Sequence, residues 1–224
     1  MRVVIFGATG MVGQGVLRGC LLDPDVESVL AVVRNSSLPH HDKLREIVHQ
    51  DVFDLSAVLD RLAGFDACFF CLGVSVVGMK EEEYRRLTFD LTVSVGRTLA
   101  KLNPTMTFIY VSGAGTDSTE RGRQMWARVK GRTENTLLEM PFKAVYLFRP
   151  AYIQPLHGVR TKTAWYGAVY AVMRPFYPVL KMLFPNYVTT TECVGRAMLK
   201  VTKRGLPKPV LENRDINRTC AQES

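Results

Sequence analysis

The stretch Gly7-Ala8-Thr9-Gly10-Met11-Val12-Gly13 decides the fold of this 224-residue chain. A short apolar run at residues 2–6 precedes it and predicts a buried strand. An apolar helical spacing over residues 11–22 follows it, with Pro24 beyond the helix end. The stretch is therefore a G-x-x-G-x-x-G turn between a strand and a helix, which is typical of a dinucleotide-binding loop.

The three glycines of this loop have different physical tasks. Gly7 permits a tight turn, Gly10 lets the backbone approach a pyrophosphate, and Gly13 allows close packing of helix against strand. The helix that begins there presents free N–H groups and its positive dipole end to phosphates. A glycine-containing connection that binds nothing is the alternative, but the flanking strand and helix favour a bound dinucleotide.

Strand and helix signals alternate along the rest of the chain. Strands are predicted at residues 28–33, 45–50, 66–72, 106–111, 143–148 and 208–212, and helices at 54–63, 81–102, 121–139 and 189–203. Apolar strands that alternate with helices indicate a mostly parallel sheet covered on both faces. We therefore expect an α/β, doubly wound Rossmann fold in one domain over residues 1–224. Its dinucleotide-binding core spans 1–150, and 151–224 form a small substrate-side extension.

The residue after the second predicted strand distinguishes the two nicotinamide dinucleotides. A site for NAD usually has Asp or Glu there to accept from the ribose 2′-hydroxyl, whereas Arg pairs with the 2′-phosphate of NADP. This chain has Arg34, and the following Asn35, Ser36 and Ser37 include no carboxylate. A surface arginine beside a turn is the alternative, but the position favours NADPH over NADH as the cofactor.

Two further strand ends fit a bound dinucleotide. Asp51 and Val52 follow the third predicted strand, where adenine contacts occur in such folds, and Leu72 and Gly73 end the fourth, beneath the adenine ribose. Both pairs are equally compatible with ordinary strand ends. The dinucleotide contacts expected so far are Gly7, Thr9, Gly10, Met11, Val12, Gly13, Arg34, Asp51, Val52, Leu72 and Gly73.

The charge of the chain favours anionic ligands. Lys and Arg outnumber Asp and Glu by 29 to 21, which gives a net charge of +8. The surplus is spread along the chain, which fits a phosphorylated cofactor better than a nucleic acid. The basic stretch over 121–132 has Trp126 as its one aromatic residue, and no nucleic-acid motif is present. We therefore rank nucleic acid last among the partners.

The five cysteines do not indicate a disulfide framework or a metal site. Their number is odd and their spacing does not repeat. Cys68 and Cys71 form a C-x-x-C, but it lies within an apolar predicted strand and has no second ligand pair. We expect both to be core residues, and no metal.

The start of the chain predicts its location in the cell. Strand-like residues begin at Arg2, so a charged n-region and an apolar h-region have no room before the glycine loop. We therefore expect a cytoplasmic protein. Residues 164–184 are apolar, but they make a poor transmembrane helix because they contain Arg174, Pro175, Pro178 and Lys181.

Five stretches carry a resemblance to a known family: Phe6-Gly7-Ala8-Thr9-Gly10, Phe70-Cys71-Leu72-Gly73, Val129-Lys130-Gly131-Arg132-Thr133-Glu134, Phe148-Arg149-Pro150 and Val210-Leu211-Glu212-Asn213. The chain resembles the atypical branch of the short-chain dehydrogenase/reductase superfamily. Within it, the likeness is to the Tat-interacting oxidoreductase type and to NAD-dependent epimerase/dehydratase-like proteins. The matching stretches cover nearly the whole chain, and the Val-Lys-Gly and Phe-Arg-Pro stretches are more specific than the glycine loop.

The resemblance implies a catalytic Ser, Tyr and Lys, with Tyr and Lys spaced Y-x-x-x-K on one helix face. The Lys lowers the pKa of the Tyr, whose phenol exchanges a proton with the substrate oxygen, and the Ser donates to that oxygen. Lys130 matches the Lys, which also holds the nicotinamide ribose. Pro150 matches the position where the family's backbone contacts the nicotinamide.

The chain departs from this pattern at the other two positions. Trp126 stands in place of the Tyr, and its indole donates an N–H but does not ionise. Gly113 stands in place of the working Ser, and Ser112 either substitutes for it or only ends the strand. The catalytic positions expected are thus Lys130, Ser112 and Trp126. Tyr152 is a second source of a phenol, although a tyrosine at a strand end is more often packed.

The aromatic segment after Pro150 leaves several interpretations open. A packed helical subdomain is the commoner outcome, and the alternatives are an apolar pocket or lid over a hydrophobic substrate, or a surface that touches lipid. Self-association of the chain is also left open.

The leading functional hypothesis is an NADPH-dependent oxidoreductase acting on a small apolar carbonyl compound. The second is a dinucleotide-binding regulator that turns nothing over, which Trp126 and Gly113 favour. A sugar-nucleotide epimerase rests on family analogy alone.

Overall fold

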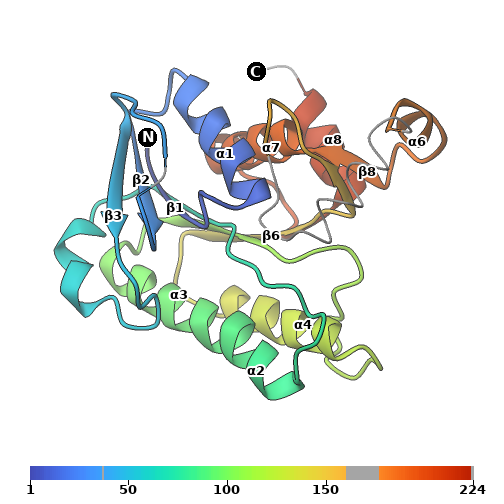
Figure 1. Ribbon diagram of the computed structural model, residues 1–224, viewed down its shortest axis with the longest axis horizontal. Coiled ribbons are helices and arrows are strands. Elements are labelled where there is room, and N and C mark those ends of the chain that lie inside the picture. Colours follow the sequence, from blue (N-terminus) through green and yellow to red (C-terminus); the bar gives the residue numbers. More distant parts are fainter. Residues whose placement is uncertain (37, 160–176, 223–224) are drawn as a thin grey trace.

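The computed structural model describes residues 1–36, 38–159 and 177–222. Its centre is a seven-stranded sheet in the order β3-β2-β1-β4-β5-β6-β9, in which every neighbouring pair is parallel (Figure 1). The strands are β1 (Arg2–Phe6), β2 (Ser28–Val33), β3 (Leu44–Val48), β4 (Ala67–Phe70), β5 (Thr107–Val111), β6 (Ala144–Arg149) and β9 (Val210–Glu212). This topology confirms the Rossmann-type α/β fold expected from the sequence.

Helices cover both faces of the sheet, and alternation along the strands explains why. In β1, Val3 and Ile5 pack into one apolar cluster, while Val4 and Phe6 pack into the other. One face is covered by α1 (Met11–Leu22), α7 (Thr191–Arg204) and α8 (Asn213–Ala221) (Figure 1). The opposite face is covered by α2 (Glu81–Arg85), η2 (Arg86–Asp90), α3 (Leu91–Leu102) and α4 (Met125–Leu138).

The 3-10 helix η1 (Ser56–Arg61) packs on the same face as α3, through Val58. The remaining elements are the small parallel sheet of β7 (Tyr152–Gln154) and β8 (Val188–Thr190), and α6 (Tyr177–Leu183). Figure 1 shows α6 standing away from the central sheet, beyond β8.

Several boundaries differ from the sequence-based expectation. Residues 54–63 contain only the short η1, and the helix expected at 81–102 is interrupted by the π-helical turn η2. The strands β7 and β8 were not predicted, because three residues carry too little periodicity. The helix α8 was not predicted either, because most of its nine residues are polar. The extension beyond residue 150 also contributes to the core, since β9 pairs with β6 and α7 packs against α1.

One covalent link was missed by the sequence analysis. Cys193 at the start of α7 and Cys220 near the end of α8 form a disulfide, with their Cα atoms 5.4 Å apart. The odd number of cysteines argued against a framework of several bridges, but it is compatible with one bridge and three free cysteines.

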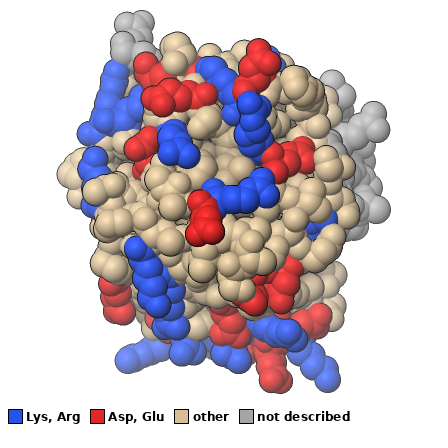
Figure 2. Space-filling model, turned by 90° about the vertical axis from the view of Figure 1, so that its left-hand side faces the viewer, with Lys and Arg blue, Asp and Glu red and all other residues tan. Residues whose placement is uncertain are grey.

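The surface charge shows no large region of one sign on the face drawn in Figure 2. On that face, Lys and Arg side chains are interleaved with Asp and Glu (Figure 2).

Within the described ranges, none of the helices has the length and hydropathy that a membrane span requires. Most of the apolar segment expected at 164–184 lies outside the described residues.

Candidate dinucleotide site

The glycine loop connects β1 to α1 at the carboxyl edge of the sheet, and two of its glycines are required by the chain itself. Gly7 has a φ of +87°, and a Cβ there would lie 2.7 Å from the carbonyl carbon of Cys71. A Cβ at Gly13 would lie 2.0 Å from the carbonyl oxygen of Gly7. Both positions therefore exclude any side chain, which fixes the tight turn and the close approach of α1.

Gly10 is different, because the backbone does not demand a glycine there. It is the N-cap of α1 and has the extended conformation φ −79°, ψ 167°, which other residues adopt freely. A Cβ at Gly10 would have one tight neighbour, the carbonyl oxygen of Gly7 at 3.3 Å. A side chain at Gly10 is thus allowed by the backbone conformation and needs only a small shift of the Gly7 carbonyl, whereas it would obstruct a group that approaches the backbone from outside.

The N-terminus of α1 is open to an anion. Gly10 supplies no side-chain cap, and the first turn of α1 carries no acidic residue. The N–H groups of that turn therefore have no side-chain acceptor, and the positive end of the helix dipole is not neutralised. Thr9, Met11 and Val12 at the entrance are all partly exposed. The loop thus fits a pyrophosphate group.

The adenosine-side residues lie at neighbouring strand ends of the same edge. Arg34 follows β2 and is exposed, and its carbonyl accepts a 2.6 Å hydrogen bond from the side chain of Gln50. Asp51 lies in the turn after β3, where its carboxylate accepts from the backbone N–H of Phe53 at 2.9 Å. Val52, Leu72 and Gly73 are partly or fully exposed at the ends of β3 and β4. Parallel strands bring all these residues to one edge.

Lys130 lies near Gly113 and Pro150, where the family resemblance implies the nicotinamide. Its Nζ donates to the carbonyl oxygen of Ser112, and a Cβ at Gly113 would be 3.7 Å from the same Nζ. The carbonyl of Pro150 accepts from the backbone N–H of Ala114 at 2.9 Å. Burial lowers the pKa of Lys130 to about 8, although the carboxylate of Glu134 opposes this shift. The structure therefore brings together Lys130, Gly113 and Pro150 as the resemblance implied.

The hydroxyl of Ser112 is engaged inside the protein. It donates to Glu134 Oε1 at 2.5 Å and lies 3.2 Å from the carbonyl oxygen of Phe148. Ser112 is buried, and it is the backbone carbonyl of this residue, not the hydroxyl, that contacts Lys130. Ser112 is thus not free to donate to a substrate oxygen in place of the serine missing at Gly113.

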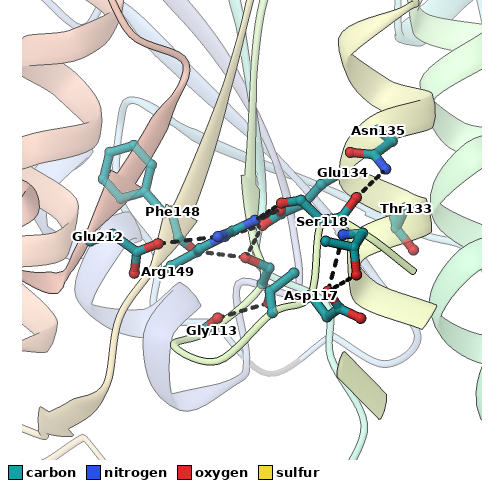
Figure 3. A network of polar contacts seen from close by, with 12 residues as sticks. Gly113, Asp117, Ser118, Thr133, Glu134, Asn135, Phe148, Arg149 and Glu212 are labelled. Carbon is teal, nitrogen blue, oxygen red and sulfur yellow. Dashed lines mark hydrogen bonds and ion pairs between the residues drawn. The ribbon is translucent and has the colours of Figure 1, made fainter. Parts of the chain in front are cut away.

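Glu134, which accepts from this serine, belongs to an ion-pair network with Arg149 and Glu212 (Figure 3). Glu134 on α4 is fully buried and forms an ion pair with Arg149 at the end of β6. Arg149 also pairs with Glu212 at 3.1 Å and donates to the hydroxyl of Ser118 at 2.5 Å. The sequence analysis quoted these residues within the family stretches but gave them no role. The spacing of Glu134, one turn after Lys130 on the same helix face, is the signal that was available.

Trp126 occupies the position of the expected phenol. It precedes Lys130 by four residues in α4, and its indole Cη2 would lie 3.2 Å from a Cβ at Gly115. The indole N–H has no acceptor within the part of the chain that the structure describes. The indole supplies no group that ionises.

Tyr152, the second source of a phenol, lies in β7. Its hydroxyl donates to Gln154 Oε1 at 2.9 Å. Burial and the nearby phenol of Tyr177 raise the pKa of Tyr152, which disfavours the phenolate. No lysine in the described ranges offsets this shift, in contrast to the pairing that the family pattern implies.

The C-x-x-C lies where the core-cysteine interpretation places it. Cys68 is fully buried in β4, and Cys71 is partly buried just after that strand. Burial raises the pKa of the Cys68 thiol well above its usual range and that of Cys71 to about 12. In the described residues, no group of three or more His, Cys, Asp or Glu side chains is arranged to hold a metal ion.

Comparison with solved structures places this geometry among known folds. ADP-L-glycero-D-manno-heptose-6-epimerase of Helicobacter pylori matches with a TM-score of 0.64 and 18% identity, over 90% of this chain and 73% of the epimerase. WbmG of Bordetella bronchiseptica, solved in complex with NAD, matches with a TM-score of 0.67 and 14% identity, over 94% and 71%. The oxidoreductase ylbE of Lactococcus lactis matches with a TM-score of 0.54 and 18% identity, over 68% and 70%.

The chain has the fold of the NAD-dependent epimerases and short-chain dehydrogenase/reductase-like oxidoreductases. The resemblance found in the sequence is thereby confirmed for the fold. No family model matches the chain.

Curated relatives share sequence as well as fold. Protein FMP52, mitochondrial, of Saccharomyces cerevisiae is 28% identical over 170 residues, which are 75% of this chain and 71% of that protein. Proteins of the same name from Candida glabrata and Emericella nidulans are 25% and 27% identical, and the match spans 62% and 66% of their lengths.

These names correct the expected location. The sequence analysis predicted a purely cytoplasmic protein from the lack of room for a secretory signal before the glycine loop. The relatives from three fungi are all named mitochondrial, and this contradicts that prediction. The argument was wrong because it considered only a secretory signal, which is one of several targeting signals.

Proposed function

We propose that the chain binds a nicotinamide dinucleotide along the carboxyl edge of its sheet, with NADPH preferred over NADH. The start of α1 carries this proposal. The backbone conformation of Gly10 does not require a glycine, and in the described residues the N–H groups of the first turn have no side-chain acceptor. A bound pyrophosphate would occupy the space beside Gly10 and accept hydrogen bonds from these N–H groups. The preference for NADPH is supported by Arg34, which is exposed beyond β2 and has no carboxylate beside it in sequence.

The reaction we propose is reduction of a small apolar carbonyl compound. When bound, the dinucleotide supplies a hydride. Lys130 is placed to hold the nicotinamide ribose, since its amine lies beside Gly113 and the backbone at Pro150 borders the same space. An apolar compound is supported by Trp126, because an apolar ring stands at the position where the family pattern has a phenol.

A specific observation favours a second function, a dinucleotide-binding regulator without turnover. Reduction of a carbonyl needs a proton for the developing alkoxide, and a positioned acid contributes about 10²–10⁴-fold in rate. Trp126 cannot ionise, and the hydroxyl of Ser112 is committed to Glu134. The phenol that the family pattern implies is thus absent, and the hydroxyl of Ser112 is engaged in another hydrogen bond.

Two measurements on the same protein separate these functions. Calorimetric titration with NADPH and NADH tests binding, and a fall in NADPH absorbance with a panel of aldehydes, ketones and quinones tests turnover. Binding with turnover supports the oxidoreductase, and tight binding without turnover supports the regulator. Failure to bind either dinucleotide would overturn both.

A further inference from the structure

A second cavity lies on the α7–α8 side of the molecule, apart from the glycine loop. It is bounded by α7, α8, β8 and the start of α6, and none of its lining residues belongs to the loop at 7–13. Its volume is about 740 Å³, which is within the range of small-molecule sites. The disulfide between Cys193 and Cys220 joins its two helical walls and holds them at a fixed separation.

The walls of this cavity carry four cationic side chains. Arg214 and Arg218 lie one turn apart on α8 and so share a face, Arg196 projects from α7, and Lys181 lies in α6. Glu192 is the one acidic residue of the lining, so the formal charge of the lining is four minus one, or +3. The positive charge of the chain, which the sequence showed to be spread out, is concentrated here by the tertiary structure.

In the described residues these four cations have no carboxylate partner, and unlike the other unpaired Lys and Arg side chains named so far they line one cavity. Arg149, Arg128 and Lys203 each form an ion pair with a carboxylate. Over the described ranges, none of the four lining cations has such a partner. Glu192 contacts His157 instead, with 3.0 Å between Glu192 Oε2 and His157 Nε2. Like charges around one cavity repel each other, and a bound anion removes that repulsion.

A buried hydroxyl in the same wall has no partner. Thr189 in β8 lines the cavity and is 3% exposed, yet its Oγ1 makes no hydrogen bond in the part of the chain that the structure describes. A buried hydroxyl without a partner costs about 1–3 kcal/mol. Oγ1 is not itself accessible from the cavity, so a ligand reaches it once the Thr189 side chain rotates, and the cost is removed if the ligand then accepts a hydrogen bond from Oγ1. The observation is independent of the four cations and points to the same occupant.

We propose that this cavity is a binding site for an organic phosphate. The phosphate lies among Arg196, Arg214 and Arg218 and accepts from Thr189, because guanidinium groups and a hydroxyl match its oxygens. Leu156 and Val188 in the same lining contact the organic part of the ligand. A soluble phosphorylated metabolite and a phospholipid headgroup share this chemistry. The exposed Met182 and Phe184 beside Lys181 are placed to meet the acyl chains in the second case.

The first experiment uses inorganic pyrophosphate as the probe. Calorimetric titration at low salt is carried out on the native chain and on Arg214→Ala, Arg196→Ala and Thr189→Val. Each arginine change should weaken binding about tenfold or more, the cost of one charged hydrogen bond. Arg121→Ala, an exposed arginine away from the cavity, is the control of equal charge. Gly10→Val is the control that removes the glycine loop as the binding site.

Thr189→Val separates a binding role from a structural one. The two side chains have the same shape, and the hydroxyl has no partner in the protein. The free energy of unfolding should therefore stay unchanged or rise, while the affinity for pyrophosphate falls. A structural hydroxyl would instead cost stability when removed.

The second experiment identifies the source of the phosphate. Sedimentation with vesicles of phosphatidylcholine alone is compared with vesicles that also contain phosphatidic acid, at low and at raised salt. If the native chain binds the acidic vesicles and Arg214→Ala does not, the ligand is a lipid headgroup. If the native chain binds pyrophosphate but not the acidic vesicles, the ligand is soluble. The proposal is overturned if the cavity variants change the binding of neither pyrophosphate nor the acidic vesicles. It is also overturned if Gly10→Val and Arg121→Ala weaken binding as much as the cavity variants do.

Discussion

The hydroxyl of Ser112 donates a 2.5 Å hydrogen bond to the buried carboxylate of Glu134. This contact ties the end of β5 to α4, one helical turn beyond Lys130. Arg149 brings the end of β6 into the same network through its ion pair with Glu134 (Figure 3). Three elements that frame the nicotinamide side of the site are thus held by one carboxylate.

Loss of that carboxylate should be costly. Breaking a buried pair from one side costs about 3–5 kcal/mol, and because Arg149 keeps its ion pair with Glu212 we expect Glu134→Gln to lie at the low end, about 3 kcal/mol. Glu81→Gln is the control, because Glu81 pairs with Arg128 at a half-exposed position, where an ion pair contributes about 1 kcal/mol or less. Urea unfolding at pH 7 measures both. Equal losses in the two variants would contradict the role given to Glu134.

Gly10 should tolerate a side chain in the fold but not in the complex. In Gly10→Val the backbone conformation is allowed, so the protein folds, while the side chain occupies the path of the pyrophosphate. Affinity for NADPH, measured by calorimetry, should fall about tenfold or more. Gly13→Ala is the contrasting variant, since its Cβ would meet the carbonyl oxygen of Gly7 at 2.0 Å and disturb the fold itself. Unchanged NADPH affinity in a folded Gly10→Val would refute the assignment.

Arg34 should account for the preference between the two dinucleotides. A charged pair with the 2′-phosphate is worth about 1.5–3 kcal/mol, and the native chain should bind NADPH more tightly than NADH by that amount. Arg34→Ala should remove most of the difference by weakening NADPH alone. Arg97→Ala, an exposed arginine on α3, should change neither affinity. A native preference for NADH would show that the site is read wrongly.

Trp126→Tyr should create or raise turnover. A phenol at this position lies four residues before Lys130 and can pass a proton, which is worth about 10²–10⁴-fold in rate. The native chain should reduce generic carbonyl compounds very slowly, with NADPH affinity nearly equal in the two proteins. Steady-state oxidation of NADPH measures this. Rapid turnover by the native chain would mean that another group, such as Tyr152, delivers the proton.

Gly113→Ser adds less than the family pattern suggests. A Cβ at Gly113 has room, since its neighbours are Lys130 Nζ at 3.7 Å and the Pro150 carbonyl oxygen at 3.9 Å. The φ of Gly113 is +138°, however, and a side chain there is strained by about 1–3 kcal/mol. We therefore expect the double variant Trp126→Tyr, Gly113→Ser to lose stability, and Trp126→Tyr alone to be the cleaner test.

Lys130 should give the protein a distinctive dependence on pH. Its pKa is about 8 in the folded chain and 10.5 as the ordinary value. Between these values the unfolded chain holds a proton that the folded chain lacks, so unfolding takes up a proton and stability rises with pH. Below pH 8 both states are protonated and the cost of the buried charge is fully present. The native chain should gain up to about 3 kcal/mol over Lys130→Met from pH 8 to 10.5. A difference that stays constant across this range in urea unfolding would contradict the assignment.

The sequence by itself determined the fold class and the place of the site. The motif from Gly7 to Gly13 and the alternation of apolar strands with helices are local patterns, and local patterns follow from backbone geometry within a few residues. Parallel strands then bring their carboxyl ends to one edge, which is why Arg34 could be predicted near the glycine loop. Lys130 was predicted from the family resemblance of its stretch.

The tertiary structure decided which distant residues meet. Glu134 contacts Ser112 across 22 positions of sequence, and Cys193 pairs with Cys220 across 27. The order of the sheet, with β9 beside β6, also depends on crossovers that no local pattern encodes. The arginines of α7 and α8 read as scattered surface charges in sequence. They enclose one cavity because burial of the apolar faces of these helices fixes how the helices pack, and the packing sets where their polar faces converge.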